Sequence, residues 1–378
     1  MPSPSLRVPL LLCGAFFGHV LYPVGVQLAA RAVAPRPDDL EQDPDTERYV
    51  TAVVPAYGER TTVGPLIELL LHGPGSPVAE VVAVVDDDHA TGEVARAAGA
   101  VVVEGDERWG KAGAVNRGVA RAGHDVVLLL DANVTVDGAT LRRLTDHVRD
   151  GRLDLVGGVR TEHGRTGESL YWTFENLAKT AEDRLGGSLA LVGEMMALRR
   201  GLFQPIPEWV RVDDLFLGLD FASRRHRVSV DTSCVSAEPS ATPRQQLTRR
   251  LRMMEAFLEV LVRRPDLFLT PTRPVALLNA HRTWRVTGGP VCQVVLAGLA
   301  ARNARRSPVA AAWAALNAFA VADYVVAARR DRDQGGRLRA LLAQALGMPP
   351  AVTGAAAVGV VRRLSSGGNS GTWTSVQR

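Results

Sequence analysis

Two apolar runs in the middle of the chain each end in acidic residues. The run EVVAVV leads into Asp86–Asp88, and the run VVLLL leads into Asp131–Asn133. Short runs of Val and Leu that stop at acidic residues are typical of buried strands. Because parallel α/β sheets bind ligands beyond the carboxyl ends of their strands, these acids should meet at one crevice. Carboxylates gathered in such a crevice hold a cation, or the hydroxyls and amides of a ligand.

Other polar residues have both a chemical and a purely structural interpretation. Lys111 lies between a glycine and a predicted helix, where it can reach a phosphate or stand as a solvated surface lysine. Glu59 can line a pocket or sit as a carboxylate at a helix entry. Asp213 and Asp214 precede a predicted helix, so they can act as acids or cap that helix, and Asp86–Asp88 have the same alternative. The residues alone leave these alternatives open.

A basic amphipathic helix is predicted over Pro243–Val262. Arg244, Arg249, Arg250 and Arg252 alternate with apolar residues at helical spacing. Such a helix can lie on a membrane surface or close over an anionic ligand. The third interpretation is a solvated helix packed on the domain.

Strands and helices alternate through the middle of the chain, which predicts a parallel α/β sheet. The expected strands lie at 49–55, within 80–90, within 124–137, at 153–160, 189–199 and 228–235. The expected helices lie at 63–72, 91–98, 113–122, 139–149, 167–185 and 212–225.

The net charge and the cysteine spacing disfavour a nucleic-acid-binding protein, a cysteine metal site and a disulfide-stabilised fold. A formal net charge of +4 over 378 residues is small, so nucleic acid is not an expected partner. Cys13, Cys234 and Cys292 are far apart in sequence and show neither metal-ligand spacing nor a disulfide framework.

Apolar stretches near both ends predict membrane association. Val8–Ala30 is about as long as a bilayer-spanning helix. Arg31 and Arg36 follow it and Arg7 alone precedes it, which places the amino terminus outside and the following chain in the cytoplasm. Near the carboxyl end, the apolar stretches are Val286–Ala301, Pro308–Ala328 and Leu338–Val361. If all of them crossed, one arginine cluster would face outwards, so one crossing is expected to be partial or interfacial.

Five segments, in order, resemble family 2 glycosyltransferases. They are VVPAYGER, VVDDDHATGEVARAAGA, RWGKAGAVNRGVARAGHDVVLLLDANVTVD, VDDLFLGLDFASRRHRV and RQQLTRRLRM, from residue 53 to residue 253. Together with the flanking apolar stretches, they resemble the membrane-integrated branch of that family. This branch includes synthases of cellulose, hyaluronan and other exopolysaccharides, and glycolipid glycosyltransferases.

The resemblance implies a GT-A-like nucleotide-diphospho-sugar transferase fold and an inverting sugar transfer. It implies that Asp214 is the general base, with Asp213 second, and that Glu194 shapes the acceptor side, a buried paired Glu being the alternative. Asp131 and Asn133 would hold a divalent cation, Mg or Mn. The residues implied in binding the nucleotide sugar are Pro55, Ala56, Glu59, Asp86, Asp87, Lys111, Asp131, Arg249 and Arg252.

Three positions depart from the family pattern. Asn133 stands where the family has a second carboxylate, which lowers the negative charge offered to a cation. The acidic pair is Asp213–Asp214 rather than Glu-Asp, which keeps the base position. Met253 replaces a Trp associated with long-polymer synthesis, and Arg249 replaces a Gln, which puts processive synthesis in doubt.

The resemblance also implies an organisation and partners. The expected parts are an N-terminal membrane anchor (1–34), a linker (35–48), a glycosyltransferase catalytic domain (49–242), an amphipathic interfacial helix region (243–273), C-terminal membrane helices (274–362) and a polar tail (363–378). The expected partners are a nucleoside-diphosphate sugar, with UDP as the nucleotide, a glycan or lipid-linked acceptor, and membrane lipids. The expected location is the inner cell membrane, multi-pass, with the catalytic domain in the cytoplasm. A catalytically inactive nucleotide-binding scaffold, suggested by Asn133, and a nucleotidyltransferase are the alternative functions.

Overall fold

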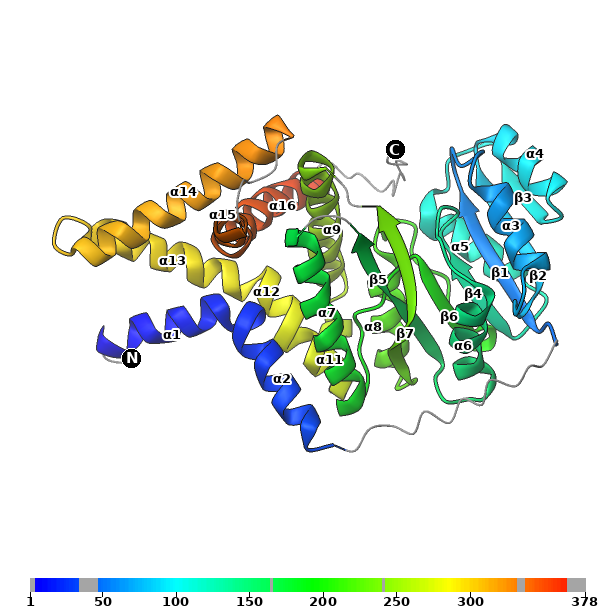
Figure 1. The fold of residues 1–378 in the computed structure, drawn as a ribbon, viewed down its shortest axis with the longest axis horizontal. Coiled ribbons are helices and arrows are strands. Elements are labelled where there is room, and N and C mark those ends of the chain that lie inside the picture. Colours follow the sequence, from blue (N-terminus) through cyan, green and yellow to red (C-terminus); the bar gives the residue numbers. More distant parts are fainter. Residues whose placement is uncertain (1–3, 34–46, 164–165, 240–241, 332–336, 366–378) are drawn as a thin grey trace.

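A seven-stranded sheet forms the centre of the computed structural model, which describes residues 4–33, 47–163, 166–239, 242–331 and 337–365 (Figure 1). The strands are β1 (Val50–Ala56), β2 (Val78–Asp86), β3 (Val101–Gly105), β4 (Val126–Leu130), β5 (Leu155–His163), β6 (Met195–Arg199) and β7 (Val228–Pro239). Most of the predicted linker and of the polar tail, and Arg36, lie outside the described residues.

The sheet is mostly parallel, in the order β3-β2-β1-β4-β6-β5-β7. Strand β6 alone among these runs antiparallel to its neighbours, β4 and β5. The predicted parallel α/β class is therefore confirmed. Strand β3 (VVVEG) was not among the expected strands, and the expected strand at 189–199 forms only over its last five residues.

Helices cover both faces of the sheet. In the sheet domain they are α3 (Val63–His72), α4 (His89–Ala97), α5 (Gly110–Arg121), α6 (Gly138–Arg149), α7 (Thr166–Leu185), the 3-10 turn η2 (Arg200–Leu202) and α8 (Asp213–Ser223). Val53 of β1 packs into a core with α5 and α8, while its neighbour Val54 packs into a second core with α3, α4 and α6. Alternate side chains of a strand point to opposite faces, so runs of Val and Leu are needed where both faces are buried.

The remaining helices lie before and after the sheet domain in sequence. They are α1 (Pro4–Phe16), the π-turn η1 (Phe17–Leu21), α2 (Tyr22–Arg31), α9 (Pro243–Arg263), α10 (Pro265–Leu269), α11 (Arg273–Leu278), the π-turn η3 (Asn279–Thr283), α12 (Trp284–Val286), α13 (Gly288–Asn303), α14 (Pro308–Arg330), α15 (Arg337–Leu342), the π-turn η4 (Ala343–Gly347) and α16 (Met348–Ser365). Helices α1, α13 and α14 project away from the sheet in one direction (Figure 1).

Within the described residues, three helical stretches are long and apolar enough to cross a membrane: Val8–Arg31, Pro308–Arg330 and Ala343–Ser365. The first is interrupted by η1, so α2 turns aside and packs along α7 instead of continuing α1 (Figure 1). Helix α13 has 16 residues, the short length expected of the stretch near Val286–Ala301. Membrane association is thus supported by these three stretches.

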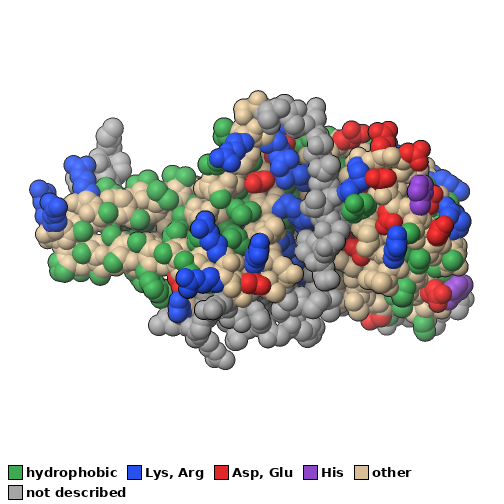
Figure 2. All heavy atoms as spheres, turned by 90° about the horizontal axis from the view of Figure 1, so that it is seen from above, with side chains coloured by type: hydrophobic (Ala, Val, Ile, Leu, Met, Phe, Trp, Pro, Cys, Tyr) green, Lys and Arg blue, Asp and Glu red, His purple; other side chains and the backbone are tan. Residues whose placement is uncertain are grey.

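Arginines lie at the far end of the projecting helices. Arg302, Arg305 and Arg306 lie between the last turn of α13 and the start of α14, where the two helices form a hairpin (Figure 1). Figure 2 shows hydrophobic side chains along the projecting part of the molecule and Lys and Arg side chains at its tip. This cluster therefore lies on the side away from the sheet, and the expectation that one crossing is partial or interfacial stays a prediction.

Helix α9 is packed on both of its sides rather than lying free on a surface. Ala256 and Val260 are buried in the core beneath α8, while Leu247, Leu251 and Met254 pack with residues of α14, η4 and α16. Its start is fixed by a capping box between Thr242 and Gln245. Helix α9 is thus the structural link between the sheet domain and the apolar helices.

Candidate active site

The ammonium of Lys111 joins two of the predicted acids beyond the carboxyl ends of the strands. Its Nζ lies 2.8 Å from Oδ1 of Asp131 and 3.2 Å from Oδ2 of Asp213. It also donates to the carbonyl oxygen of Gly193 at 3.2 Å. Burial would lower the pKa of Lys111, but the carboxylates of Asp131 and Asp213 outweigh it and raise this pKa. Lys111 is therefore a firmly held cation and not the solvated surface lysine that the sequence left possible.

Asp86 sets the start of the helix that carries Lys111. This carboxylate is fully buried and accepts hydrogen bonds from the backbone N–H groups of Trp109 at 2.5 Å and Gly110 at 3.1 Å, and from Nε of Arg108 at 3.2 Å. Gly110 has a φ of +69°, a conformation that suits glycine at the turn into α5. Asp86 thus acts as an anchor for α5, and its predicted part in nucleotide binding stays a prediction.

The next two residues, Asp87 and Asp88, have surroundings unlike those of the buried Asp86. Asp87 is exposed and has a φ of +54°, a strained value for a residue other than glycine, directly after β2. Asp88 caps α4 by accepting from the N–H of Thr91, and it also accepts from the N–H of Gly58 at 2.9 Å. The capping alternative therefore holds for Asp88, and Asp87 presents its carboxylate to solvent at the strand end.

Asp213 and Asp214 begin helix α8, where the helix dipole favours negative charge. Asp214 accepts from the N–H of Leu215 at 2.8 Å. Burial, and then the charge of Asp213, raise the pKa of Asp214 to about 6, against the opposing effects of Leu215 and Lys111. Asp214 is therefore a carboxylate with a pKa close to neutrality, which is the range that suits a general base.

Gly193 shapes the space between these groups, and sequence reasoning missed it. A Cβ at this position would lie 3.4 Å from Nζ of Lys111, 3.6 Å from Oδ1 of Asp213 and 3.6 Å from Cβ of Asp214. Any side chain here would stand between the cation and the acidic pair. Its neighbour Glu194 was singled out from the sequence, but nothing in the local pattern marks the glycine itself.

Glu194 is a buried, paired carboxylate that joins the site to its surroundings. It accepts from Nη1 of Arg160 at 2.8 Å and from Oγ of Ser236 at 3.0 Å, and Nη2 of Arg249 lies 3.6 Å from its Oε1. Its carbonyl oxygen accepts from the N–H of Asp131 at 3.1 Å. The pairing agrees with the structural alternative for Glu194, and its predicted acceptor role stays a prediction.

Arg252 of α9 reaches the same acids. Burial lowers the pKa of Arg252, while the charges of Asp131 and Asp213 act in the opposite direction. Helix α9 thus adds the charge of Arg252, which acts on Asp131 and Asp213, and that of Arg249, which lies 3.6 Å from Glu194.

The other predicted residues lie in strand β1 or follow strands β1 and β4 in sequence. Pro55 and Ala56 are buried at the end of β1. Glu59 accepts from Oγ1 of Thr62 at 2.9 Å, which matches the helix-entry alternative. Asn133 is half-buried in the turn that follows Asp131. Their ligand contacts stay predictions.

A divalent cation fits the donors present. The carboxylates of Asp131 and Asp213 converge on one positive charge, that of Lys111, and the half-buried amide of Asn133 follows Asp131 by two residues. In the described part of the chain no group of three or more His, Cys, Asp or Glu side chains is placed to hold a metal. Mg²⁺ and similar hard ions are commonly held by one or two carboxylates plus substrate phosphates, so this small oxygen set suits a cation that binds together with a diphosphate.

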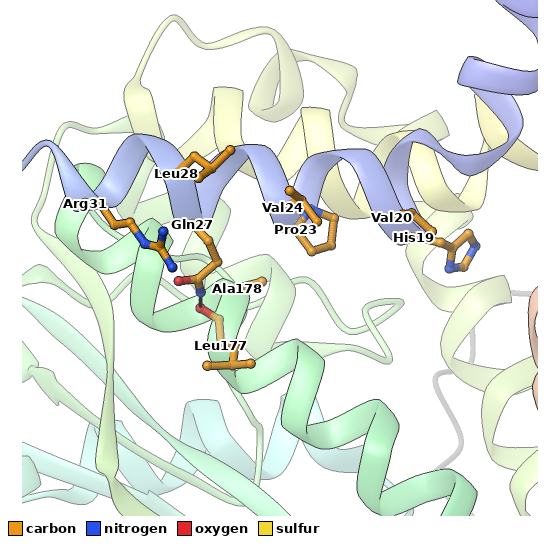
Figure 3. A pocket seen from close by; sticks show the side chains of 9 residues that line it. All are labelled: His19, Val20, Pro23, Val24, Gln27, Leu28, Arg31, Leu177 and Ala178. Carbon is orange, nitrogen blue, oxygen red and sulfur yellow. Dashed lines mark hydrogen bonds between the residues drawn. The ribbon is translucent and has the colours of Figure 1, made fainter.

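An apolar groove lies apart from these acids, between α2 and α7. It encloses about 430 Å³, and none of the predicted site residues lines it. Figure 3 shows its lining: His19, Val20, Pro23, Val24, Gln27, Leu28, Arg31, Leu177 and Ala178. Gln27 donates to the carbonyl oxygen of Leu177 and so ties the two helices together. Seven of these nine lining residues belong to the candidate membrane span Val8–Arg31.

Comparisons with known proteins bear on the family and on the fold. Residues 51–206 match the model of Glycosyl transferase family 2. The whole fold is similar to that of mannosyltransferase PcManGT from Pyrobaculum calidifontis in complex with GDP-Man and Mn²⁺. The two share 21% identity, the match covers 94% of this chain and 98% of that chain, and the TM-score is 0.72.

A looser likeness links the chain to glucosyl-3-phosphoglycerate synthase from Mycobacterium tuberculosis in complex with Mn²⁺, UDP-Glc and phosphoglyceric acid. The identity is 20%, the match covers 64% of this chain and 83% of that chain, and the TM-score is 0.42. No curated protein sequence matches the chain. The first likeness confirms the GT-A-like fold flanked by apolar helices.

Removal of the Asp86 carboxylate should destabilise the protein. In Asp86→Ala, the N–H groups of Trp109 and Gly110 lose their acceptor in a buried place, which should cost about 2–4 kcal/mol. We expect the thermal midpoint to fall by roughly 5–10 °C, measured by scanning fluorimetry of the purified protein. Asp106→Ala, at an exposed position nearby, is the control. An unchanged midpoint in Asp86→Ala would show that this carboxylate does not hold α5.

Proposed function

We propose that this chain, a glycosyltransferase with a family 2 domain over residues 51–206, is an inverting enzyme that moves a sugar from a nucleoside-diphosphate donor to a hydroxyl of a glycan or lipid-linked acceptor. UDP is the nucleotide we expect. The division of the chain into anchor, linker, catalytic domain, interfacial helix region, membrane helices and tail, with the boundaries given above, is part of this proposal.

One observation carries the proposal: Lys111 bridges Asp131 and Asp213 beside Asp214, whose pKa is raised to about 6. Transfer from a nucleotide sugar builds negative charge on the departing diphosphate and requires a base for the incoming hydroxyl. A fixed cation and a carboxylate with a pKa near neutrality, held on adjacent elements, meet both needs.

Asp214 is the base in this proposal, and Asp213 has a supporting part. The carboxylate of Asp213 is engaged by Lys111 at 3.2 Å, so it orients that cation. Asp214 has a pKa of about 6, so it is mostly ionised at neutral pH and still basic enough to accept a proton from a hydroxyl. The charge of Asp213 contributes to this pKa, which gives the pair two different tasks.

Positive charge for the diphosphate comes from the chain itself. Lys111 stands in the first turn of α5, and Arg249 and Arg252 lie on α9. Asp131 and Asn133 would hold a divalent cation, Mg or Mn, which when bound neutralises charge on the diphosphate oxygens.

The acceptor is proposed to be lipid-linked, and the reaction to take place at the cytoplasmic face of the inner membrane. Arg31, Arg329 and Arg330 end the apolar helices α2 and α14, as expected for the cytoplasmic side. The groove between α2 and α7 supports a lipid chain as part of the acceptor, since its lining is almost entirely apolar (Figure 3).

Loss of the base should abolish turnover while the donor still binds. We expect Asp214→Asn to lower kcat by roughly a hundredfold or more, because general-base catalysis typically contributes 10²–10⁴-fold. Release of nucleoside diphosphate would be measured with a panel of sugar donors, membrane lipid extract and Mn²⁺, and donor affinity by calorimetry.

The same experiment separates the enzyme from a nucleotide-binding scaffold. A scaffold would release no diphosphate as wild type, and Asp214→Asn would leave its cellular phenotype intact. Wild-type release that persists unchanged in Asp214→Asn would remove Asp214 from the mechanism.

Two substitutions should move the acidic limb of the pH–rate profile in opposite directions. The charge of Asp213 raises the pKa of Asp214, so Asp213→Asn should shift the limb below pH 6. Lys111 lowers the same pKa, so Lys111→Met should shift it above pH 6. The measurement is kcat against pH over roughly pH 4.5–8.5, the range in which such a carboxylate titrates. Shifts in the same direction for both variants would contradict the assignment of the limb to Asp214.

Filling the apolar groove should weaken binding of the acceptor alone. Leu177→Trp enlarges a groove residue on α7, and we expect KM for the lipid-linked acceptor to rise roughly tenfold with the donor KM unchanged, as for a lost apolar contact surface. Val309→Trp, an exposed position on α14, is the control. An equal rise in both variants would show that the groove has no specific part in acceptor binding.

A further inference from the structure

We propose that five charged side chains form a latch by which the apolar helix α16 holds α9 in place and so positions Arg252 and the acidic pair of the active site. The latch residues are Arg211, Glu255, Glu259, Arg263 and Arg363. They are positioning residues, since none of them takes part in the mechanism above. The proposal rests on the proposed function and extends it to a helix far from the acids in sequence.

Two glutamates of α9 form the centre of the latch. Nη1 of Arg211 lies 3.6 Å from Oε2 of Glu255, and Nη2 of Arg211 lies 3.3 Å from Oε2 of Glu259. From α16, Nη2 of Arg363 lies 3.6 Å from Oε2 of Glu255, and its Nε lies 3.9 Å from Oε2 of Glu259. Nε of Arg263 completes the set at 3.1 Å from Oε1 of Glu259.

Because the cluster is largely buried, its stability depends on every one of its charges being paired. The side chain of Glu259 is only 3% exposed and that of Arg211 only 12% exposed. A buried carboxylate requires compensating charge, so Glu259 cannot move away from its arginines without a large loss of stability. The cluster therefore fixes the distance between α16, α9 and the segment that contains Arg211.

Each member lies close in sequence to a residue of the active site. Arg211 precedes Asp213 by two residues, in the segment that enters α8. Glu255 follows Arg252 by three residues, which places the two on neighbouring positions of the α9 surface. The charge of Arg211 also acts on Arg252. Displacement of the latch would therefore shift both the acids and the arginine that faces them.

A glycine on α16 is a second, independent sign of this contact. A Cβ at Gly359 would lie 2.3 Å from Oε1 and 2.8 Å from Cδ of Glu255, so a side chain there would push the Glu255 carboxylate out of its present position. Glycine is disfavoured in helix interiors, so its place opposite the Glu255 carboxylate matches a need for close approach. On the same helix, a Cβ at Gly354 would meet nothing within 4 Å. Gly354 therefore provides a matched control.

The experiment compares two pairs of variants in the full-length, membrane-extracted protein. Gly359→Ala is compared with Gly354→Ala, and Arg363→Ala with Arg362→Ala, an exposed neighbour on α16. We expect Gly359→Ala and Arg363→Ala to raise the donor KM or lower kcat by roughly ten- to hundredfold, since small displacements of positioned groups cost about this much. Arg363→Lys should restore part of the loss, and both control variants should behave as wild type.

A structural measurement, hydrogen exchange, tests the latch independently of enzyme activity. Hydrogen exchange of the α9 backbone should quicken in Gly359→Ala and Arg363→Ala and stay unchanged in the controls. If wild type released no diphosphate, the proposed function would fail while this exchange result still decided whether α16 holds α9. A lower thermal midpoint with unchanged kcat and donor KM would overturn the positioning role, as would equal kinetics within each pair. If Arg363→Ala fails to fold, Gly359→Ala decides the question.

Discussion

The contact of one ammonium with two carboxylates organises the site. Lys111, Asp131 and Asp213 come from the start of α5, the end of β4 and the start of α8, which are far apart in sequence. Two carboxylates this close would repel each other without a cation between them, so Lys111 stabilises the approach of α8 to the sheet. The same charge lowers the pKa of Asp214 while Asp213 raises it. Structure and acid–base chemistry thus depend on one side chain.

Charged and polar contacts also fasten the apolar helices to the sheet domain. Glu182 of α7 is buried and accepts from the hydroxyl of Tyr22 in α2 at 3.0 Å, and His281 of η3 lies 3.0 Å from the same oxygen. Among the apolar helices, Gln293 of α13 donates to the carbonyl oxygen of Leu346 at 2.6 Å. Apolar packing distinguishes helix partners poorly in lipid, because lipid tails are equally apolar, whereas hydrogen bonds and ion pairs are specific. Such contacts therefore define where each apolar helix sits.

The sequence predicted the parts of the site that depend on local pattern and missed those that depend on tertiary contact. Strands that end in acidic residues singled out Asp131, and the resemblance to a family singled out Lys111 and the Asp213–Asp214 pair, which the structure brings together, whereas Asp86, found in the same way, anchors α5. The pairing of Glu194 with Arg160 and the role of Gly193 required coordinates, because each partner lies on a different element. The turn at η1 was also missed, since an apolar run reads the same whether it is straight or bent.

An amide rather than a carboxylate at position 133 is consistent with an active site when the formal charges of all the surrounding acidic and basic side chains are added. Four carboxylates, those of Asp131, Asp213, Asp214 and Glu194, are matched by four cations, Lys111, Arg160, Arg249 and Arg252, so the described cluster is close to neutral before any ligand binds. A carboxylate at position 133 would add a negative charge next to the place proposed for a diphosphate. The amide oxygen of Asn133 still suits a hard cation but holds it less tightly, so diphosphate oxygens must complete the ligand set. In the proposed function, Asn133 would therefore make cation binding depend on the donor, which differs from a loss of catalysis.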